Sequence, residues 1–176
     1  MSSIFYAREL YGSRTKILKY VGAYTSYDML KDALSIVDTQ IGHRDYIIEM
    51  KDISDYTMPK TVYYFTHHQG IKLEPNGNFS NITFDIGVYY SKRIMRNTPL
   101  YSNREMEAKN GCSDKYIYNK NICFGTKDED GNLFKYGKYG KGWSIECNEL
   151  EVYTGTKRGL KKHVSSLLSK YFETRQ

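Results

Sequence analysis

Two segments of the sequence repeat apolar residues at intervals of three and four, the spacing of a helix with one buried face. The first follows the N-cap candidate Ser26 and predicts a helix over residues 26–41. The second predicts a helix over residues 157–172, with lysines and serines opposite its apolar stripe. The two stripes are Leu30, Ala33, Leu34, Val37 and Ile41, and Leu160, Val164, Leu167, Leu168 and Tyr171. Another part of the chain has to cover each stripe, because a large apolar helix face is unfavourable in water.

Most of the remaining sequence predicts short β-strands, since Val, Ile, Tyr and Phe cluster between turn-forming residues such as Gly12 and Ser13. We predict strands at residues 5–10, 17–24, 46–50, 62–66, 71–73, 82–90, 116–125, 132–135, 143–147 and 150–153. Residues 93–113 hold Pro99 and Gly111 among alternating charges, which predicts a long loop or a short irregular helix. Together these elements predict a single α+β domain over residues 1–176, with an antiparallel or mixed sheet of about seven to nine strands.

The two ends of the chain resemble each other. The cap candidates Ser26 and Thr156 are separated by the same interval as the stripe residues Leu30 and Leu160. A Tyr-Thr pair precedes each helix, although matching the two pairs requires an adjustment of one residue. The pattern indicates either duplicated strand-strand-helix units at about 4–41 and 133–172, or a chance likeness of two ordinary units.

Composition limits the class of protein. The chain has 176 residues, 40% of them apolar, and 18 tyrosines spread along its length, which is typical of a folded domain. No apolar segment approaches the length of a membrane span and no export signal is evident, so we expect a cytoplasmic protein without membrane contact. Cys112, Cys123 and Cys147 form no CxxC pair, so we expect no disulfide framework, no structural metal and no cofactor.

A net charge of +6 and a basic-aromatic segment at residues 135–143 favour a polyanionic ligand, either nucleic acid or nucleotide phosphate. Lysines neutralise phosphates, and flat rings stack on bases. The predicted binding residues are Lys138, Tyr139, Lys141, Trp143, Lys157, Arg158, Lys161 and Lys162.

The segment Gly155-Thr-Lys-Arg-Gly-Leu-Lys-Lys162 resembles the C-terminal part of double-stranded RNA-binding domains, in which a helix opens with a basic cluster. The resemblance covers about 30 residues and implies phosphate contacts from the start of this helix. The chain departs from that pattern at His163, Val164 and Leu167, where those helices carry small residues.

The N-terminal segments Ile4-Phe5-Tyr6 and Tyr20-Val21-Gly22 resemble the GIY-YIG nuclease pattern, although the first glycine is missing. That resemblance implies a metal-dependent nuclease in which Tyr6 and Tyr20 face one phosphate, with Glu49 as a candidate metal ligand. His67 and His68 are further candidate catalytic residues. Adjacent residues of a strand point to opposite faces, however, so the two histidines are not expected to line one site.

These patterns rank the functions as follows. We predict a small basic binder of nucleic acid or nucleotide, and next a protein-binding inhibitor or regulator of a host factor, because Tyr and Arg are also favoured at protein interfaces. A metal-dependent nuclease is the third alternative. The richness in Lys, Tyr, Ile and Asn is typical of an AT-rich genome and predicts a phage or viral accessory protein that acts in the host cytoplasm.

Overall fold

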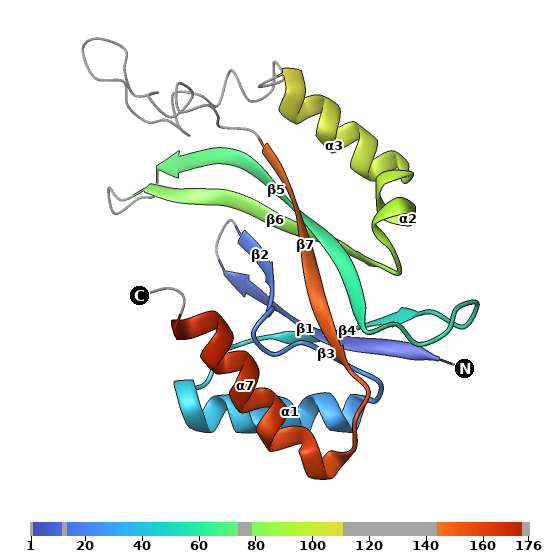
Figure 1. Cartoon of the computed structure of the whole chain (residues 1–176). Helices are drawn as coiled ribbons and strands as arrows, with labels where there is room; N and C mark the ends of the chain where they lie inside the picture. The colour runs from blue at the N-terminus through green and yellow to red at the C-terminus, as the bar shows by residue number, and fades with distance from the viewer. Residues whose placement is uncertain (1, 12–13, 74–78, 111–143, 174–176) are drawn as a thin grey trace.

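The computed structural model describes residues 2–11, 14–73, 79–110 and 144–173. Its strands are β1 (Ser3–Tyr11), β2 (Arg14–Ile17), β3 (Ala23–Tyr24), β4 (Ile47–Asp52), β5 (Thr61–Leu73), β6 (Phe79–Tyr89) and β7 (Ser144–Tyr153). Its helices are α1 (Tyr27–Ile41), α2 (Lys92–Arg96), α3 (Pro99–Asn110) and α7 (Leu160–Glu173), the last preceded by the 3-10 turn η1 (Lys157–Gly159). Figure 1 shows α1 and α7 together on one side of the strands, and α2 and α3 at the other end.

The strands form one mixed sheet that closes on itself. The order is β2-β6-β5-β7-β3-β1-β4, and β2 also pairs with β1, so six strands make a closed circuit from which β4 projects as an edge strand on β1. The pairs β2–β6 and β3–β7 are parallel, and the other pairs are antiparallel. The predicted α+β class with a mixed sheet is therefore confirmed.

The inside of the circuit is an apolar core to which all six strands contribute. Its members from the strands are Ile4, Tyr6, Ile17, Ala23, Val62, Tyr64, Val88, Leu150 and Val152. Successive side chains of a strand point to opposite faces, so the neighbours of these residues point outward. For example, Ala23 faces the inside whereas Tyr24 faces the helices.

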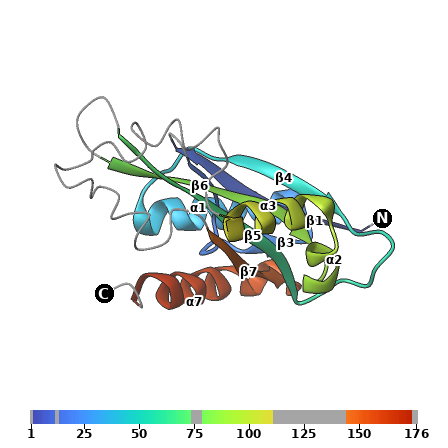
Figure 2. The same cartoon turned by 90° about the horizontal axis from the view of Figure 1, so that it is seen from above.

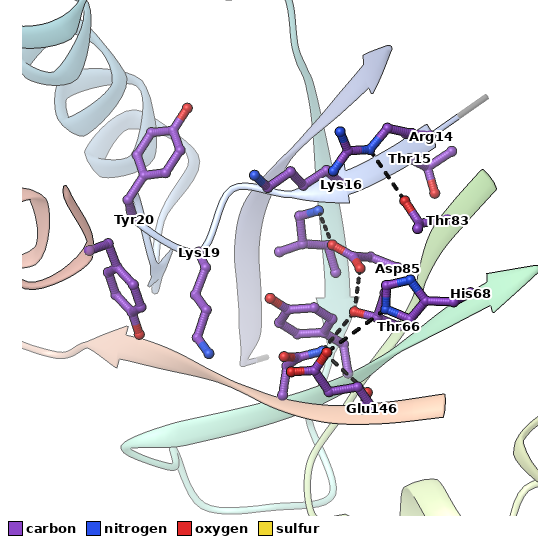
Figure 3. Close-up of a pocket in the computed structure, with 14 residues that line it drawn as sticks. Arg14, Thr15, Lys16, Lys19, Tyr20, Thr66, His68, Thr83, Asp85 and Glu146 are labelled. Atoms are coloured by element: carbon purple, nitrogen blue, oxygen red, sulfur yellow. Dashed lines mark hydrogen bonds and ion pairs between the residues drawn. The ribbon is translucent and has the colours of Figure 1, made fainter. Parts of the chain in front are cut away.

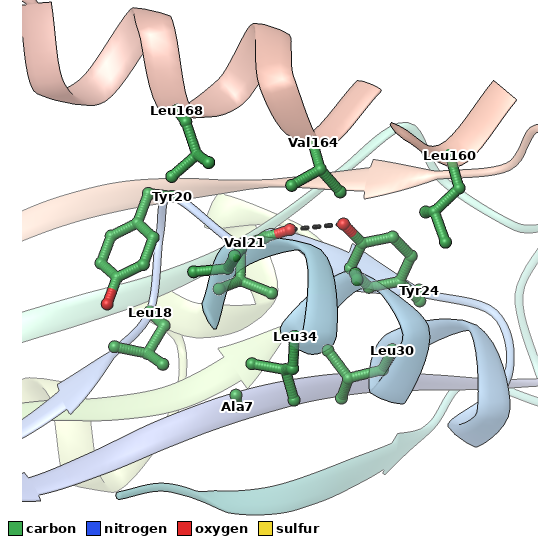
Figure 4. Packing of buried hydrophobic residues seen from close by; sticks show 12 residues of the cluster. Ala7, Leu18, Tyr20, Val21, Tyr24, Leu30, Leu34, Leu160, Val164 and Leu168 are labelled. Atoms are coloured by element: carbon green, nitrogen blue, oxygen red, sulfur yellow. Dashed lines mark hydrogen bonds between the residues drawn. The ribbon is translucent and has the colours of Figure 1, made fainter. Parts of the chain in front are cut away.

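A second core lies between the circuit and the pair α1 and α7 (Figure 4). It joins both predicted stripes to the outer face of β1 and the turn after β2; its buried members are Ala7, Leu18, Tyr20, Val21, Tyr24, Leu30, Ala33, Leu34, Val37, Leu160, Val164 and Leu168. Helix α1 begins where predicted, because the Ser26 Oγ accepts a hydrogen bond from the Met29 N–H at 3.1 Å. The two amphipathic faces therefore cover each other and the sheet together.

A third cluster packs α2 and α3 against the outer face of β5, β6 and β7. Phe65 is fully buried there and meets the ring of Tyr101 edge to face, at 5.0 Å between centroids. Met95 of α2 is also fully buried. Figure 1 shows these two helices at the opposite end of the strands from α1 and α7, and the view from above in Figure 2 shows them in front of the strands. The prediction of a loop or short irregular helix over 93–113 therefore underestimates the helical structure, because α3 alone has 12 residues and extends to Asn110.

Several strand boundaries differ from the sequence predictions. The strand predicted at 17–24 is wrong, since a turn at residues 18–22 separates β2 from the two-residue β3. Gly22 has a φ of +83°, and a Cβ there would lie 3.1 Å from the Glu151 carbonyl oxygen, so glycine is required at this turn. The strands predicted separately at 62–66 and 71–73 are parts of the single long strand β5. Likewise, the strands predicted at 143–147 and 150–153 fall within one strand, β7, which begins at Ser144. The predicted strands 116–125 and 132–135 lie outside the described residues.

The two proposed repeat units meet in space. Strand β3 leads into α1 and β7 leads towards α7, and the two strands pair in parallel with Tyr24 opposite Tyr153. The rings of these two tyrosines are 6.0 Å apart. Two strand-helix units therefore lie side by side, and their origin by duplication stays a prediction. None of the helices in the described ranges is long and apolar enough to span a membrane.

His163 on α7 is expected to make the stability of this core depend on pH. Its ring stacks on Tyr153 at 4.4 Å, and its buried Nε2 has no hydrogen-bond partner. Burial lowers the pKa of His163, partly offset by the nearby Glu151. The His163 ring therefore binds a proton more readily in the unfolded chain than in the folded one. For this reason the free energy of unfolding is expected to fall as pH drops below about 6.5. Urea unfolding at pH values between 8 and 5.5 measures this effect. The free energy of unfolding should fall less steeply with decreasing pH in His163→Phe than in the wild type. Equal dependence on pH in the two proteins would contradict this role of His163.

Candidate functional site: a polar cavity between β2 and β7

A cavity of about 280 Å³ lies between β2, the turn after it and the face of β5, β6 and β7 (Figure 3). It exists because β3 is short. Strand β7 pairs with β5 from Ser144 to Glu151, but with β3 only through Val152 and Tyr153. The part of β7 that precedes Val152 faces the cavity and does not pair with β2 in the described structure.

One wall of the cavity is cationic. Arg14 and Lys16 come from β2, and Lys19 comes from the turn that follows. The Arg14 Nε donates to the Thr83 Oγ1 at 3.4 Å, and the Lys19 Nζ lies 5.5 Å from the centre of the Tyr171 ring. Figure 3 shows Lys16 and Lys19 extending between Tyr20 and the group around Asp85.

A second wall, the face of β5, β6 and β7, is rich in hydrogen-bond acceptors. It combines alternate residues of three adjacent strands, which are Thr66 and His68 of β5, Thr83 and Asp85 of β6, and Glu146 and Asn148 of β7. Pairing places Thr66 opposite both Asp85 and Glu146, so all six side chains share one face of the sheet. Thr83 and Asp85 adjoin the basic residues because β6 pairs with β2, whereas Glu146 and Asn148 belong to β7, which does not pair with β2 in the described structure.

A hydrogen-bond chain stabilises the acceptor wall. The Asn148 Nδ2 donates to the Thr66 Oγ1 at 2.7 Å, and the Thr66 hydroxyl donates to the Asp85 Oδ1 at 2.6 Å. The other carboxylate oxygen of Asp85 accepts from the buried Ile17 N–H at 2.7 Å. Asp85 therefore holds β2 against β6 at the edge of the cavity.

Asp85 is an unusual carboxyl group, since it is only 7% exposed. Burial raises its pKa, while the bonds from Thr66 and Ile17 and the charges of Arg8 and Lys16 act in the opposite direction. A carboxyl group with a raised pKa beside a cavity is a feature of functional sites. His68 lies on the same wall, with its Nε2 3.9 Å from a Glu146 carboxylate oxygen.

The candidate nuclease residues do not form one site. Tyr6 and Glu49 are cross-strand neighbours on β1 and β4, and burial together with Glu49 raises the pKa of Tyr6. Tyr20 belongs instead to the core beneath α1 and α7, and its ring meets Phe172 edge to face at 5.1 Å. The two tyrosines are therefore in separate clusters, unlike the arrangement that the GIY-YIG resemblance implies. His67 is buried and does not line the cavity, whereas His68 does.

The predicted basic residues of the C-terminal helix are placed, but away from the cavity. Lys157, Arg158, Lys161 and Lys162 are all exposed, around η1 and the first turn of α7. The Lys157 Nζ lies 3.4 Å from a carboxylate oxygen of Asp32 on α1. Tyr171, which lines the cavity, lies near the other end of the same helix. The remaining predicted binding residues, Lys138, Tyr139, Lys141 and Trp143, lie outside the described residues.

Arg8 joins the cavity to the edge strand. Its Nε donates to the Glu49 carboxylate at 2.9 Å, and its Nη1 donates to the Thr15 hydroxyl and to the carbonyl oxygen of Asp85. One side chain thus connects β1, β2, β4 and β6. Arg8 is 12% exposed, which makes it a structural support of the acceptor wall.

No family model, curated protein or solved structure matches this chain, so the site has to be interpreted from its own geometry. In the part of the chain that the structure describes, no group of three or more His, Cys, Asp or Glu residues is arranged to hold a metal ion.

Proposed function

We propose that the protein binds a phosphate-bearing ligand of the nucleotide class, and that the phosphate lies against Arg14, Lys16 and Lys19 in the cavity. The observation that carries the proposal is the placement of three cations along one wall, next to the rings of Tyr20 and Tyr171. The ligand is either a free nucleotide or a terminal unit of a nucleic acid, because both present the same phosphate and base.

The physical argument rests on charge and enclosure. A phosphate bound in a cavity loses part of its water, so each cation interacts with it more strongly than on an open surface. Lysine and arginine are the side chains that bind phosphate most effectively. The half-buried Tyr171 ring lines the cavity beside Lys19 and offers an aromatic surface to a base. The cavity thus supplies both interactions that a nucleotide requires.

The cavity is a better binding site than the basic residues at the start of α7. Those four side chains are exposed, and Lys157 is next to Asp32, which partly neutralises it. Exposed charges separated by water contribute little to affinity and are screened by salt. The two regions are far enough apart along α7 to be tested separately by substitution.

The test compares two double variants that lose the same charge. Lys16→Gln with Lys19→Gln removes two cations of the cavity wall, and Lys161→Gln with Lys162→Gln removes two from α7. Binding of nucleoside mono-, di- and triphosphates and of 5′-phosphorylated oligonucleotides is measured by calorimetry and fluorescence anisotropy at two salt concentrations. We expect the cavity variant to bind at least tenfold more weakly, and the α7 variant to stay within about twofold of the wild type.

Two results would overturn the proposal. One is a loss of affinity in the α7 variant with none in the cavity variant, which would assign binding to the helix surface. The other is the absence of binding of every phosphate probe by the wild type at low salt. Circular dichroism and thermal unfolding of both variants establish that each one is folded before binding is compared.

A further inference from the structure

The charge of the cavity lining differs between β2 and β7, and this difference points to the chemistry of the ligand's other end. We infer that the cavity selects nucleotides whose base carries amino groups, which donate hydrogen bonds to Glu146 and Asn148 of β7. The inference rests on the proposed function and adds a base preference to it.

The first step concerns orientation. A phosphate against Glu146 would meet a carboxylate, whereas against Arg14, Lys16 and Lys19 it meets three cations. Like charges at close range in a poorly hydrated cavity repel strongly. The phosphate therefore lies at the β2 wall, and the base faces the strands β5, β6 and β7.

The second step concerns which acceptors are available to a base. Asp85 and Thr66 are already bonded to each other and to the Ile17 N–H and Asn148. Glu146 is different, because its side chain is 65% exposed and the His68 Nε2 lies 3.9 Å from its carboxylate. A carboxylate accepts several hydrogen bonds and donates none when ionised, so Glu146 prefers N–H groups to carbonyl oxygens. A base with an amino group supplies such a donor.

The third step concerns specificity. A base that presents a carbonyl oxygen in place of the amino group would put two acceptors against each other and leave both without a donor. Unpaired polar groups of this kind cost more than a missing contact, and binding sites use them to reject close analogues. The expected discrimination is moderate, since Glu146 remains partly in contact with water.

The experiment uses pairs of mononucleotides that differ in one amino group. The second member of each pair carries a carbonyl oxygen where the first carries the amino group: CMP is compared with UMP, and AMP with IMP, by calorimetry on the wild type, on Glu146→Ala and on Glu149→Ala. Glu149 lies on the same strand but outside the cavity lining, with its carboxylate 3.9 Å from the Lys92 Nζ. Glu149→Ala therefore removes the same charge from β7 without changing the acceptor wall. Pyrophosphate is the probe for the phosphate wall alone.

We expect the wild type and Glu149→Ala to bind the amino-bearing member of each pair at least fivefold more tightly, and Glu146→Ala to discriminate less than twofold. Pyrophosphate affinity should not fall in Glu146→Ala. Equal binding within each pair would overturn the base preference and leave the phosphate site in place. Unchanged discrimination in Glu146→Ala would overturn the assignment to this wall. If neither the mononucleotides nor pyrophosphate bind, the proposed function itself fails.

Discussion

Replacing Tyr24 with alanine is expected to lower the free energy of unfolding by about 4 kcal/mol. Tyr24 is fully buried at the point where the short strand β3 joins β1 and β7. Its ring packs among the residues of α1 and α7, and its hydroxyl donates to the Val21 carbonyl oxygen at 2.6 Å. Truncation would leave a cavity at the junction of two helices and three strands, where little of the structure can relax.

Chemical denaturation monitored by circular dichroism measures this loss, with two comparison variants. Tyr24→Phe keeps the ring and removes only the hydroxyl, so a cost of about 1 kcal/mol is expected for the unpaired Val21 carbonyl. Tyr27→Ala truncates a nearby tyrosine that is 47% exposed and should cost well under half as much as Tyr24→Ala. Equal losses for Tyr24→Ala and Tyr27→Ala would show that the β3 junction does not depend on Tyr24.

Asp85→Leu is expected to lower the free energy of unfolding by about 3 kcal/mol, because it leaves two hydrogen-bond donors without an acceptor. The buried Ile17 N–H and the Thr66 hydroxyl both donate to this carboxyl group. Each buried donor that loses its acceptor costs about 1–3 kcal/mol. Asp85→Asn has a similar shape and keeps one acceptor, while the Thr66 hydroxyl can rotate, so it should cost no more than about 1 kcal/mol at pH 7.

The same position provides a pH test with a definite sign. Burial raises the pKa of Asp85 above that of the unfolded chain. The stability that its protonated form contributes is fully present below the unfolded pKa of about 3.9 and is lost as pH rises through the folded value. The wild type should therefore gain stability relative to Asp85→Asn when pH is lowered from 7.5 to 4.5. If the wild type instead lost stability relative to Asp85→Asn over this pH interval, the hydrogen bonds to the Asp85 carboxylate would have a larger effect on its pKa than burial.

The secondary structure near the two helices was predictable because its causes are local. The stripe of α1, its Ser26 cap and the stripe of α7 depend on residues within a few turns of one another, and the structure confirms both helices. Strand breaks were predicted less well. Residues such as Gly70 within β5 and Asn148 within β7 resemble turn formers, but Gly70 pairs with Ile82 of β6 and Asn148 pairs with Tyr64 of β5, so the ladders continue through both positions.

The cavity was not predictable to the same degree. Arg14, Lys16 and Lys19 are ordinary surface cations by sequence, and Asp85 lies in a strand whose period gives no sign that it is buried. The one sequence signal was the pair Thr66 and His68, polar residues two positions apart in β5, which indicates a polar sheet face. The basic residues of α7 were the more conspicuous pattern, and the structure places them on an open surface.

By itself, the sequence determined the α+β class, the two amphipathic helices and the need for a common core that covers them. Only the tertiary structure decided that β1 pairs with three strands, that β3 stops after two residues, and that a cavity remains between β2 and β7. The physical reason is the range of the interactions. Helix periodicity and capping act over a few residues, whereas Arg14, Asp85 and Glu146 meet only because pairing between distant strands brings them to one place.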